Sequence, residues 1–208
     1  MRITPLVENT TQCELKPAAG LLFYIETQRH TLLFDVGPDK TLFENARRRH
    51  IDLAKVDTVI LSHGHADHGG ALRDFLKINP TAKVYVQRRA FEPHSCKVLF
   101  LKFPVGIDQA LASHAQVRCL DGDFQIDEEL RLFTVSQTDK CHSPMNDCLL
   151  DSHGRDAFVH EQNLIITEGT SSVLVMGCGH AGVVNILERA KPYAPQVCVG
   201  GFHLLTQS

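Results

Sequence analysis

The sequence predicts an α/β protein in which sheets are covered by helices. An apolar strand over 56–61 leads through a glycine-rich loop into a helix over 71–78 and then a strand over 83–86, an order typical of α/β layers. Apolar, β-branched and aromatic residues also form two pairs of segments, each joined by a short polar link, at 21–27 with 31–36 and at 163–167 with 172–176. Such pairs predict β-hairpins.

The other regular elements follow from spacing. Leu42 and Ala46 lie on one face of an expected helix over 41–50. A third helix is expected over 181–190, and short apolar runs predict strands at 130–135 and 197–199.

Two segments are less regular. The stretch 87–133 contains Pro93, Pro104 and Gly106, and we expect it to form a helical insertion or lid over a site. The stretch 138–154 is polar and broken by Pro144, which predicts a loop.

Composition restricts the class of protein. The 208 residues carry a net charge of −3 with no long run of one sign, so nothing indicates nucleic acid or anionic lipid as a partner. No apolar stretch reaches the length of a membrane span, and residues 1–5 lack the apolar run of a signal peptide. We therefore expect one domain over 1–208 that binds a small-molecule substrate and has no nucleic-acid or membrane partner.

Cysteine usage indicates the compartment. There are seven cysteines, an odd number, and no two of them form a CxxC pair. Most are expected to be small buried hydrophobic residues in a reduced, cytoplasmic protein.

The strand over 56–61 ends in a cluster of potential metal ligands. His63, His65, Asp67 and His68 offer three imidazoles and a carboxylate within six positions. These ligand types suit zinc, iron(II) or manganese, and loops after strands are where α/β proteins place ligands. The alternative, a solvent-facing loop, accounts poorly for four ligand types in six positions framed by glycines. We expect one or two divalent metal ions, with zinc as the first choice.

The spacing within this cluster suggests two metal positions. His63 and His65 are two residues apart, so an extended backbone points both the same way, toward one metal. Asp67 and His68 begin the following helix and can bind a second metal, and Asp67 is also expected to be catalytic. Metal binding lowers the pKa of bound water toward about 7, which makes a metal-bound hydroxide available for hydrolysis.

The segment Ser-His-Gly-His-Ala-Asp-His-Gly-Gly at 62–70 resembles the HxHxDH signature of the metallo-β-lactamase-fold superfamily. Two later segments, Gly-Cys-Gly-His-Ala-Gly at 177–182 and Gly-Gly-Phe-His-Leu at 200–204, resemble the branch typified by dihydropterin-ribofuranosylaminobenzene phosphate synthase. The resemblance implies an αββα sandwich, with two mixed sheets flanked by helices and the metals at one edge. It also implies that Asp35 orients a ligand histidine.

Further ligands are expected after later strands. His180 follows a strand end and is the first choice. Cys178 lies where many superfamily members carry a bridging Asp; a zinc-bound thiolate and an inert buried thiol are both open. His160 falls near the third histidine of the superfamily, although the branch usually has Asp there. His203 ends the last strand and would be a ligand or a substrate contact.

His94 and His142 lie in loops and are expected to face solvent or a pocket.

One feature departs from the branch. Its members continue past the Gly-Gly-Phe-His-Leu segment to an HCTG-like segment that supplies a late histidine, whereas the printed chain ends at Ser208. The resemblance then implies a sandwich that lacks the usual C-terminal segment, a different group in that coordination place, or an incomplete site.

The leading functional hypothesis is a metal-dependent hydrolase acting on an ester, amide or phosphoester of a small molecule. The branch resemblance indicates a phosphorylated or pterin-like substrate, whose phosphate would contact metal or basic side chains such as Arg88 and Arg89, unless these are solvated surface residues. Two alternatives stay open: a di-iron redox protein, and a non-catalytic relative that binds a metal or ligand.

Overall fold

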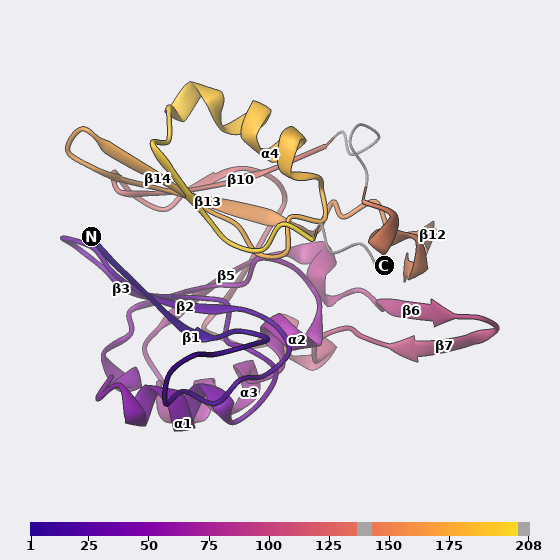
Figure 1. Ribbon diagram of the computed structural model, residues 1–208, viewed down its shortest axis with the longest axis horizontal. Helices are drawn as coiled ribbons and strands as arrows, with labels where there is room; N and C mark the ends of the chain where they lie inside the picture. The colour runs from indigo at the N-terminus through magenta and orange to yellow at the C-terminus, as the bar shows by residue number, and fades with distance from the viewer. Residues whose placement is uncertain (137–142, 204–208) are drawn as a thin grey trace.

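The computed structural model describes residues 1–136 and 143–203, so the expected positions of His142 and Leu204 lie outside the described residues. Figure 1 shows two stacked layers of strands with helices on their outer sides and a strand pair that extends away from the body. The first sheet has the strand order β1-β2-β3-β4-β5-β8. Its strands are Arg2–Val7, Leu22–Glu26, Thr31–Phe34, Thr58–Ile60, Lys83–Gln87 and Val117–Leu120.

The second sheet packs face to face with the first. Its order is β15-β14-β13-β10-β9, with only β14 and β15 running parallel. The strands are Val197–Val199, Ser171–Val175, Gln162–Glu168, Leu130–Thr134 and Phe124–Gln125. Phe34 and Ile60 of the first sheet belong to the same buried cluster as Leu132, Leu164 and Ile166 of the second, so apolar side chains from both sheets form the central core.

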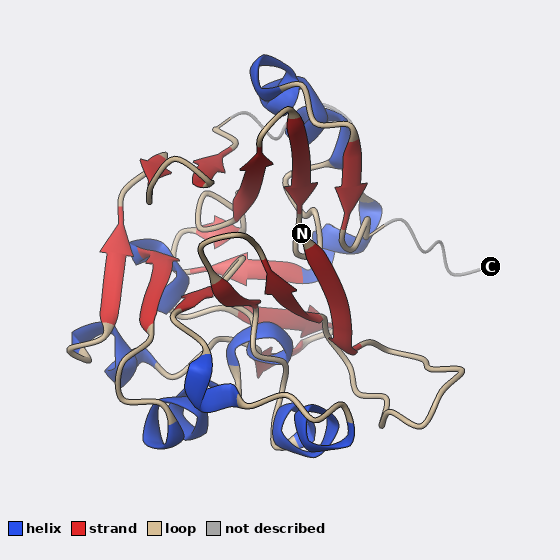
Figure 2. Cartoon of the chain, turned by 90° about the vertical axis from the view of Figure 1, so that its left-hand side faces the viewer, coloured by secondary structure: helices blue, strands red, loops and turns tan. Residues whose placement is uncertain are grey.

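Helices cover the two outer faces, as Figures 1 and 2 show. Under the first sheet lie α1 (Thr41–Arg48) and α3 (Leu72–Ile78), and they share one buried cluster with the outward-facing side chains of β3, β4 and β5. Over the second sheet lies α4 (Val183–Ala190), whose Ile186 and Ala190 pack with Leu174 of β14. The αββα sandwich predicted from the sequence is therefore present.

A third, smaller sheet corrects the prediction for 87–133. This segment contains the hairpin of β6 (Ser95–Val98) and β7 (Leu101–Pro104), together with β8, β9 and the short 3-10 helices η2 (Arg88–Phe91) and η3 (Gln109–Ser113). The helical interpretation is wrong because the apolar residues of 95–104 alternate along paired strands. The sheet order is β12-β11-β6-β7.

Part of the expected loop over 138–154 is also ordered. Its described portion, from residue 143, contains the 3-10 helix η4 (Pro144–Cys148), β11 (Leu149–Asp151) and the start of β12 (Gly154–Arg155). β11 pairs with β6, so the pairing partner lies about fifty residues away and leaves no local signal.

The two hairpins, the helix after the histidine loop and the last strand are confirmed. β1 is an edge strand that the sequence pattern did not predict; it pairs with β2, and the register shifts after Pro5. The remaining 3-10 helices are η1 (Leu53–Lys55) and η5 (Lys191–Tyr193). Among the described residues, no helix combines the length and apolar character that crossing a bilayer requires.

Candidate metal centre

The histidine loop begins where β4 ends and continues into α2 (Ala66–Gly69), a single helical turn. It meets the start of β13 at one point, because Gln162 N donates to Ser62 O at 2.7 Å. The segment after β14 carries Cys178 and His180, and the segment after β15 carries His203. Loops from both sheets therefore converge at one edge of the sandwich.

Three histidines form the first candidate metal position. His63, His65 and His180 are buried, and one ligand atom from each lies within 4.8 Å of the others. Their Nε2 atoms are buried and have no hydrogen-bond partner. Buried polar atoms without partners are rare in proteins, and three neighbouring histidines that each carry one form an arrangement that a bound cation can satisfy.

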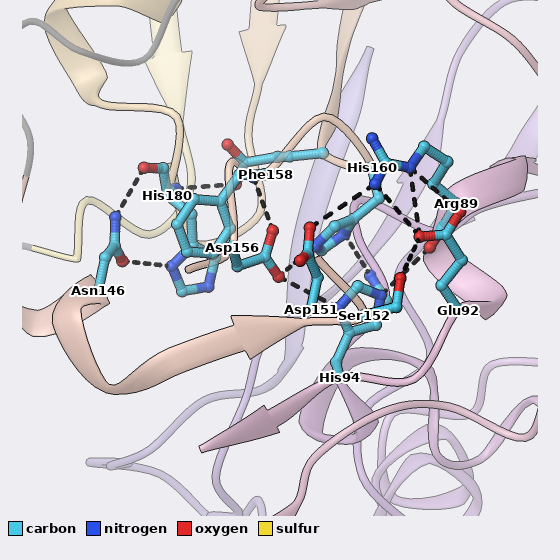
Figure 3. A network of polar contacts seen from close by, with 12 residues as sticks. Arg89, Glu92, His94, Asn146, Asp151, Ser152, Asp156, Phe158, His160 and His180 are labelled. Carbon is cyan, nitrogen blue, oxygen red and sulfur yellow. Dashed lines mark hydrogen bonds and ion pairs between the residues drawn. The ribbon is translucent and has the colours of Figure 1, made fainter. Parts of the chain in front are cut away.

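Hydrogen bonds on the opposite ring nitrogens orient two of these histidines. His63 Nδ1 lies 2.8 Å from Ser62 Oγ, whose hydroxyl donates to Asp35 Oδ2 at 2.7 Å, so the imidazole must donate from Nδ1. His180 Nδ1 donates to the Asn146 side-chain oxygen at 2.8 Å, as Figure 3 shows. Both bonds select the tautomer whose Nε2 carries a free lone pair, which is the form that binds a metal.

The electrostatic environment also favours the neutral, metal-binding form of these three histidines. Burial, and then the proximity of other imidazoles, lowers the pKa of His63, His65 and His180 well below its usual value. The neutral imidazole is the form that coordinates metal ions. The three residues therefore fit a divalent cation such as zinc.

A second set of ligands adjoins the first. Cys178 Sγ lies 3.0 Å from His68 Nε2, and ligand atoms of His63, His68 and Cys178 lie within 4.8 Å of one another. Cys178, His180 and His203 form a further group of the same kind, and His203 Nε2 is also buried without a partner. Asp67 lies at the rim, with its carboxylate 3.7 Å from His68 Nε2 and its side chain 42% exposed.

Asp35 contacts a candidate ligand histidine, as the resemblance implies. Its carboxylate accepts from His68 Nδ1 at 2.6 Å and from the backbone and hydroxyl of Ser62 at 2.7 Å each. Burial alone would lower the pKa of His68, but the adjacent Cys178 and Asp35 raise it well above its usual value. One carboxylate thus positions histidines of both ligand sets.

His160 lies beside the three-histidine group with both ring nitrogens occupied. Its Nδ1 accepts from Gly64 N at 3.1 Å, and its Nε2 donates to Asp156 Oδ2 at 3.0 Å. Asp156 also lies 3.1 Å from His94 Nδ1 (Figure 3), and the three residues with His65 form another buried group of potential ligands. The ligand role of His160 stays a prediction, and its bonds here support the backbone between His63 and His65.

His94 corrects one sequence expectation. It is 3% exposed and bonded through both ring nitrogens, to Asp156 and to the Arg89 carbonyl, so a solvent-facing position is wrong. Burial alone would raise the pKa of Asp156, but hydrogen bonds from His160 and His94 lower it far below its usual value. Asp156 is therefore a buried carboxylate behind the histidine loop.

Glu161 shapes the loop that carries His180. Its buried carboxylate accepts from His180 N at 2.9 Å and from Ala181 N at 2.7 Å. Burial raises the pKa of Glu161 to about 7, against these hydrogen bonds, which lower it. The turn at 178–181 is thus held by the side chain of the residue just before β13.

A cavity of about 660 Å³ opens beside the second ligand set. Asp67, His68, Cys178 and His203 lie on its wall, next to apolar side chains and glycine backbone, namely Leu21, Met145, Phe202, Gly20, Gly177, Gly200 and Gly201. Its volume suits a small organic molecule. Among the described residues that line it, Glu8 and Asp67 are charged, and none is a lysine or arginine.

The two arginines named from the sequence lie elsewhere. Arg88 forms an exposed ion pair with Asp121, and Arg89 pairs with Glu92. Neither lines the cavity. Arg88 and Arg89 are therefore better described as surface residues than as contacts for a substrate phosphate.

Four positioning residues were not recognised in the sequence: Ser62, Asn146, Asp156 and Glu161. Ser62 precedes His63, Glu161 follows His160, and Asp156 is four residues before His160. Their closeness in sequence to candidate ligand histidines could have identified them. Asn146 had no such signal, because it reaches His180 from 34 residues away.

Comparisons with known sequences agree with this geometry. The family model described as the metallo-beta-lactamase superfamily matches residues 16–139. An uncharacterized protein of Methanocaldococcus jannaschii is 27% identical over 206 residues, covering 96% of this chain and 78% of that protein. In the same organism, 7,8-dihydropterin-6-methyl-4-(beta-D-ribofuranosyl)-aminobenzene-5'-phosphate synthase is 27% identical over 216 residues, covering 89% of this chain and 71% of the relative.

Solved structures share the fold. Tm1679, described as a metal-dependent hydrolase of the beta-lactamase superfamily, superimposes with a TM-score of 0.80 at 24% identity, over 99% of this chain and 78% of that one. A quorum-quenching N-acyl homoserine lactone lactonase gives a TM-score of 0.56 at 16% identity, over 87% of this chain and 78% of that one. At these identities the likeness concerns the αββα architecture alone.

Proposed function

The chain belongs to the metallo-beta-lactamase superfamily, and from this premise we propose that it is a metal-dependent hydrolase of a small molecule. The observation that carries the proposal is the close approach of three buried histidines, His63, His65 and His180. One ring nitrogen of each lies within 4.8 Å of the others, and their Nε2 atoms have no hydrogen-bond partner. An ester, amide or phosphoester is the bond class that the proposal assigns to the substrate.

We assign the residues to two metal positions. His63, His65 and His180 would hold the first ion, and Asp67, His68, Cys178 and His203 would supply the second. Zinc is the metal we propose, because imidazole, thiolate and carboxylate are its usual ligands in proteins. Bound there, a divalent ion would supply Lewis acidity and lower the pKa of water that it binds.

The chain's own residues would orient the reactants. Asp35 and Asn146 keep the ligand nitrogens of His68 and His180 directed into the site through the hydrogen bonds already described. Asp67 is a partly exposed carboxylate on the wall of the cavity, which supports a role in contacting substrate as well as metal. That position agrees with the catalytic role expected for Asp67.

The cavity supports a compact substrate of pterin size. The relative named as a dihydropterin-linked phosphate synthase supports the pterin-like and phosphorylated class. Because no lysine or arginine is among the described lining residues, a phosphate group would depend on the metal ions and histidines for neutralisation.

Elemental analysis of protein purified without added metal tests the proposal directly. We expect about one to two zinc ions per chain, with iron or manganese as distinguishable outcomes. Hydrolysis of a panel of lactones, carboxyl esters and phosphodiesters should then be lost in His65→Ala, while far-UV circular dichroism keeps its folded signal.

His153→Ala is the matched control, since His153 is exposed in the turn between β11 and β12. It should retain both metal content and hydrolysis. A protein that binds no metal, or a His65→Ala variant with unchanged metal content and turnover, would contradict the proposal.

A further inference from the structure

The β6–β7 hairpin exposes a group of apolar side chains away from the metal centre. Val98 and Leu101 are 53% and 52% exposed, and Leu99 and Phe100 at the turn are each 84% exposed. Figure 1 shows the hairpin extending from the body, with its turn at one end of the molecule's longest axis. We call residues 98–101 the exposed hairpin tip. Contiguous apolar side chains that a protein leaves exposed often mark an interaction site.

Two lysines lie directly behind the hairpin tip. Lys97 and Lys102 are cross-strand partners, one residue pair back from Val98 and Leu101. The eight residues 96–103 contain these two positive charges and no acidic residue. At about 3.3 Å per strand residue, the lysine pair stands about 7 Å behind the turn.

The arrangement is unfavourable in water. Like charges directly opposite on paired strands repel one another, and four consecutive apolar side chains lose the benefit of burial. Leu99 also adopts φ of 56°, a conformation that costs a branched residue more than glycine. A surface that accepts apolar groups and carries negative charge would relieve the first two costs together.

A second copy of the chain fits this surface less well. The hairpin tip projects alone, and patches of this kind measure a few hundred Å², whereas stable interfaces bury about 800 Å² on each partner. Edge pairing through β7 would also bring Lys102 against a neighbouring strand, and lysine on an edge strand is a common device that opposes such pairing.

We propose that the β6–β7 hairpin docks this protein on an anionic lipid bilayer surface. The hairpin tip, 98–101, inserts among the acyl chains, and Lys97 and Lys102 contact the negatively charged headgroups. The 7 Å spacing matches the depth of about 5–10 Å to which interfacial segments bury their apolar groups. The sequence led us to expect no membrane partner, because a ten-residue hairpin leaves no long apolar run. This inference is independent of the metal centre.

A fluorescent reporter at the tip tests insertion. The protein contains no tryptophan, so Phe100→Trp introduces a single one. With vesicles of mixed phosphatidylcholine and phosphatidylserine, we expect a blue shift of its emission and quenching by brominated acyl chains. Phe124→Trp, on β9 and 37% exposed, is the matched reporter and should change little.

Vesicle co-sedimentation of the full chain tests the apolar and the electrostatic contributions to binding separately. Leu99→Ser with Phe100→Ser, and separately Lys97→Glu with Lys102→Glu, should each weaken binding to the mixed vesicles about tenfold or more. Ile78→Ser with Leu187→Ser, and Lys55→Glu with Lys83→Glu, make equivalent changes at exposed positions elsewhere and should leave binding unchanged. High salt should weaken binding of the unmodified protein.

Three results would overturn the proposal. The first is an unchanged Phe100→Trp spectrum with both mixed vesicles and vesicles of phosphatidylcholine alone. The second is equal binding to the two kinds of vesicle, which removes the role of the lysines. The third is a dimer in sedimentation velocity that the two serine substitutions dissociate, without vesicle binding, which would assign the hairpin tip to a second copy of the chain.

Discussion

The carboxylate of Asp35 accepts a hydrogen bond from His68 Nδ1 at 2.6 Å, and both side chains are completely buried. Asp35 has φ of 65°, a backbone conformation that asparagine tolerates as well as aspartate does. Asp35→Asn therefore keeps the turn while removing the charge that orients His68. Loss of such an outer partner commonly lowers metal affinity about 10- to 100-fold. Competition with a chromophoric chelator would measure it, and affinity within twofold of the unmodified protein would contradict this role.

Asn146 is expected to orient His180 in the first candidate metal position. Its side chain accepts from His180 Nδ1 and donates to His180 O, both at 2.8 Å. Asn146→Ala removes both bonds and should weaken metal binding at the first position about tenfold or more. Asn146→Asp keeps the acceptor for His180 Nδ1 and should lose less. Isothermal titration calorimetry of the metal-free variants would measure their metal affinities. An alanine variant that binds metal as tightly as the aspartate variant would show that the hydrogen bond to His180 Nδ1 does not control metal binding.

Gly64 is constrained by space. A Cβ at this position would meet the Ala90 carbonyl and, at 2.8 Å, His94 Nε2, closer than side chains allow. Gly64→Ala should displace the backbone between His63 and His65 and lower both metal content and thermal stability. Gly106→Ala, whose Cβ would meet its nearest atom at 3.3 Å, is the milder comparison and should lose less of each. Equal losses in the two variants would show that the crowding at Gly64 is not decisive.

His30 predicts a pH dependence of stability. It bridges Asp57 at 2.8 Å and Asp127 at 2.5 Å, joining the first sheet to the second. Burial alone would lower the pKa of His30, but the two aspartates raise it overall. A histidine whose pKa is higher when folded stabilises the protein below its unfolded value of about 6.5, and this contribution is lost as pH rises through the folded value.

Urea unfolding across this range should therefore show the free energy of unfolding falling with pH above about 6.5. His30→Gln should flatten that slope, whereas His153→Gln, at an exposed turn, should leave it unchanged. The same slope in His30→Gln as in the unmodified protein would assign the pH dependence to other groups.

Local patterns predicted much of the fold and one part of the site. Runs of apolar, β-branched and aromatic residues located β2, β3, β13 and β14, because such residues favour strands that are buried on both faces. The cluster at 63–68 was legible because its ligands are close in sequence. The β6–β7 hairpin was misread as helical, since its strands are short and pair in part with β11 from a distant segment.

The α/β class, the order of most elements and the loop that carries the candidate metal ligands could all be predicted from the sequence, because they depend on residues near one another in the chain. The folded structure was needed to show which histidines His180 joins, that Asn146 orients it, and that the tip of the β6–β7 hairpin stays exposed. These relationships depend on the packing of two sheets, which brings together side chains separated by tens to more than a hundred residues. No local pattern encodes which distant segments will meet.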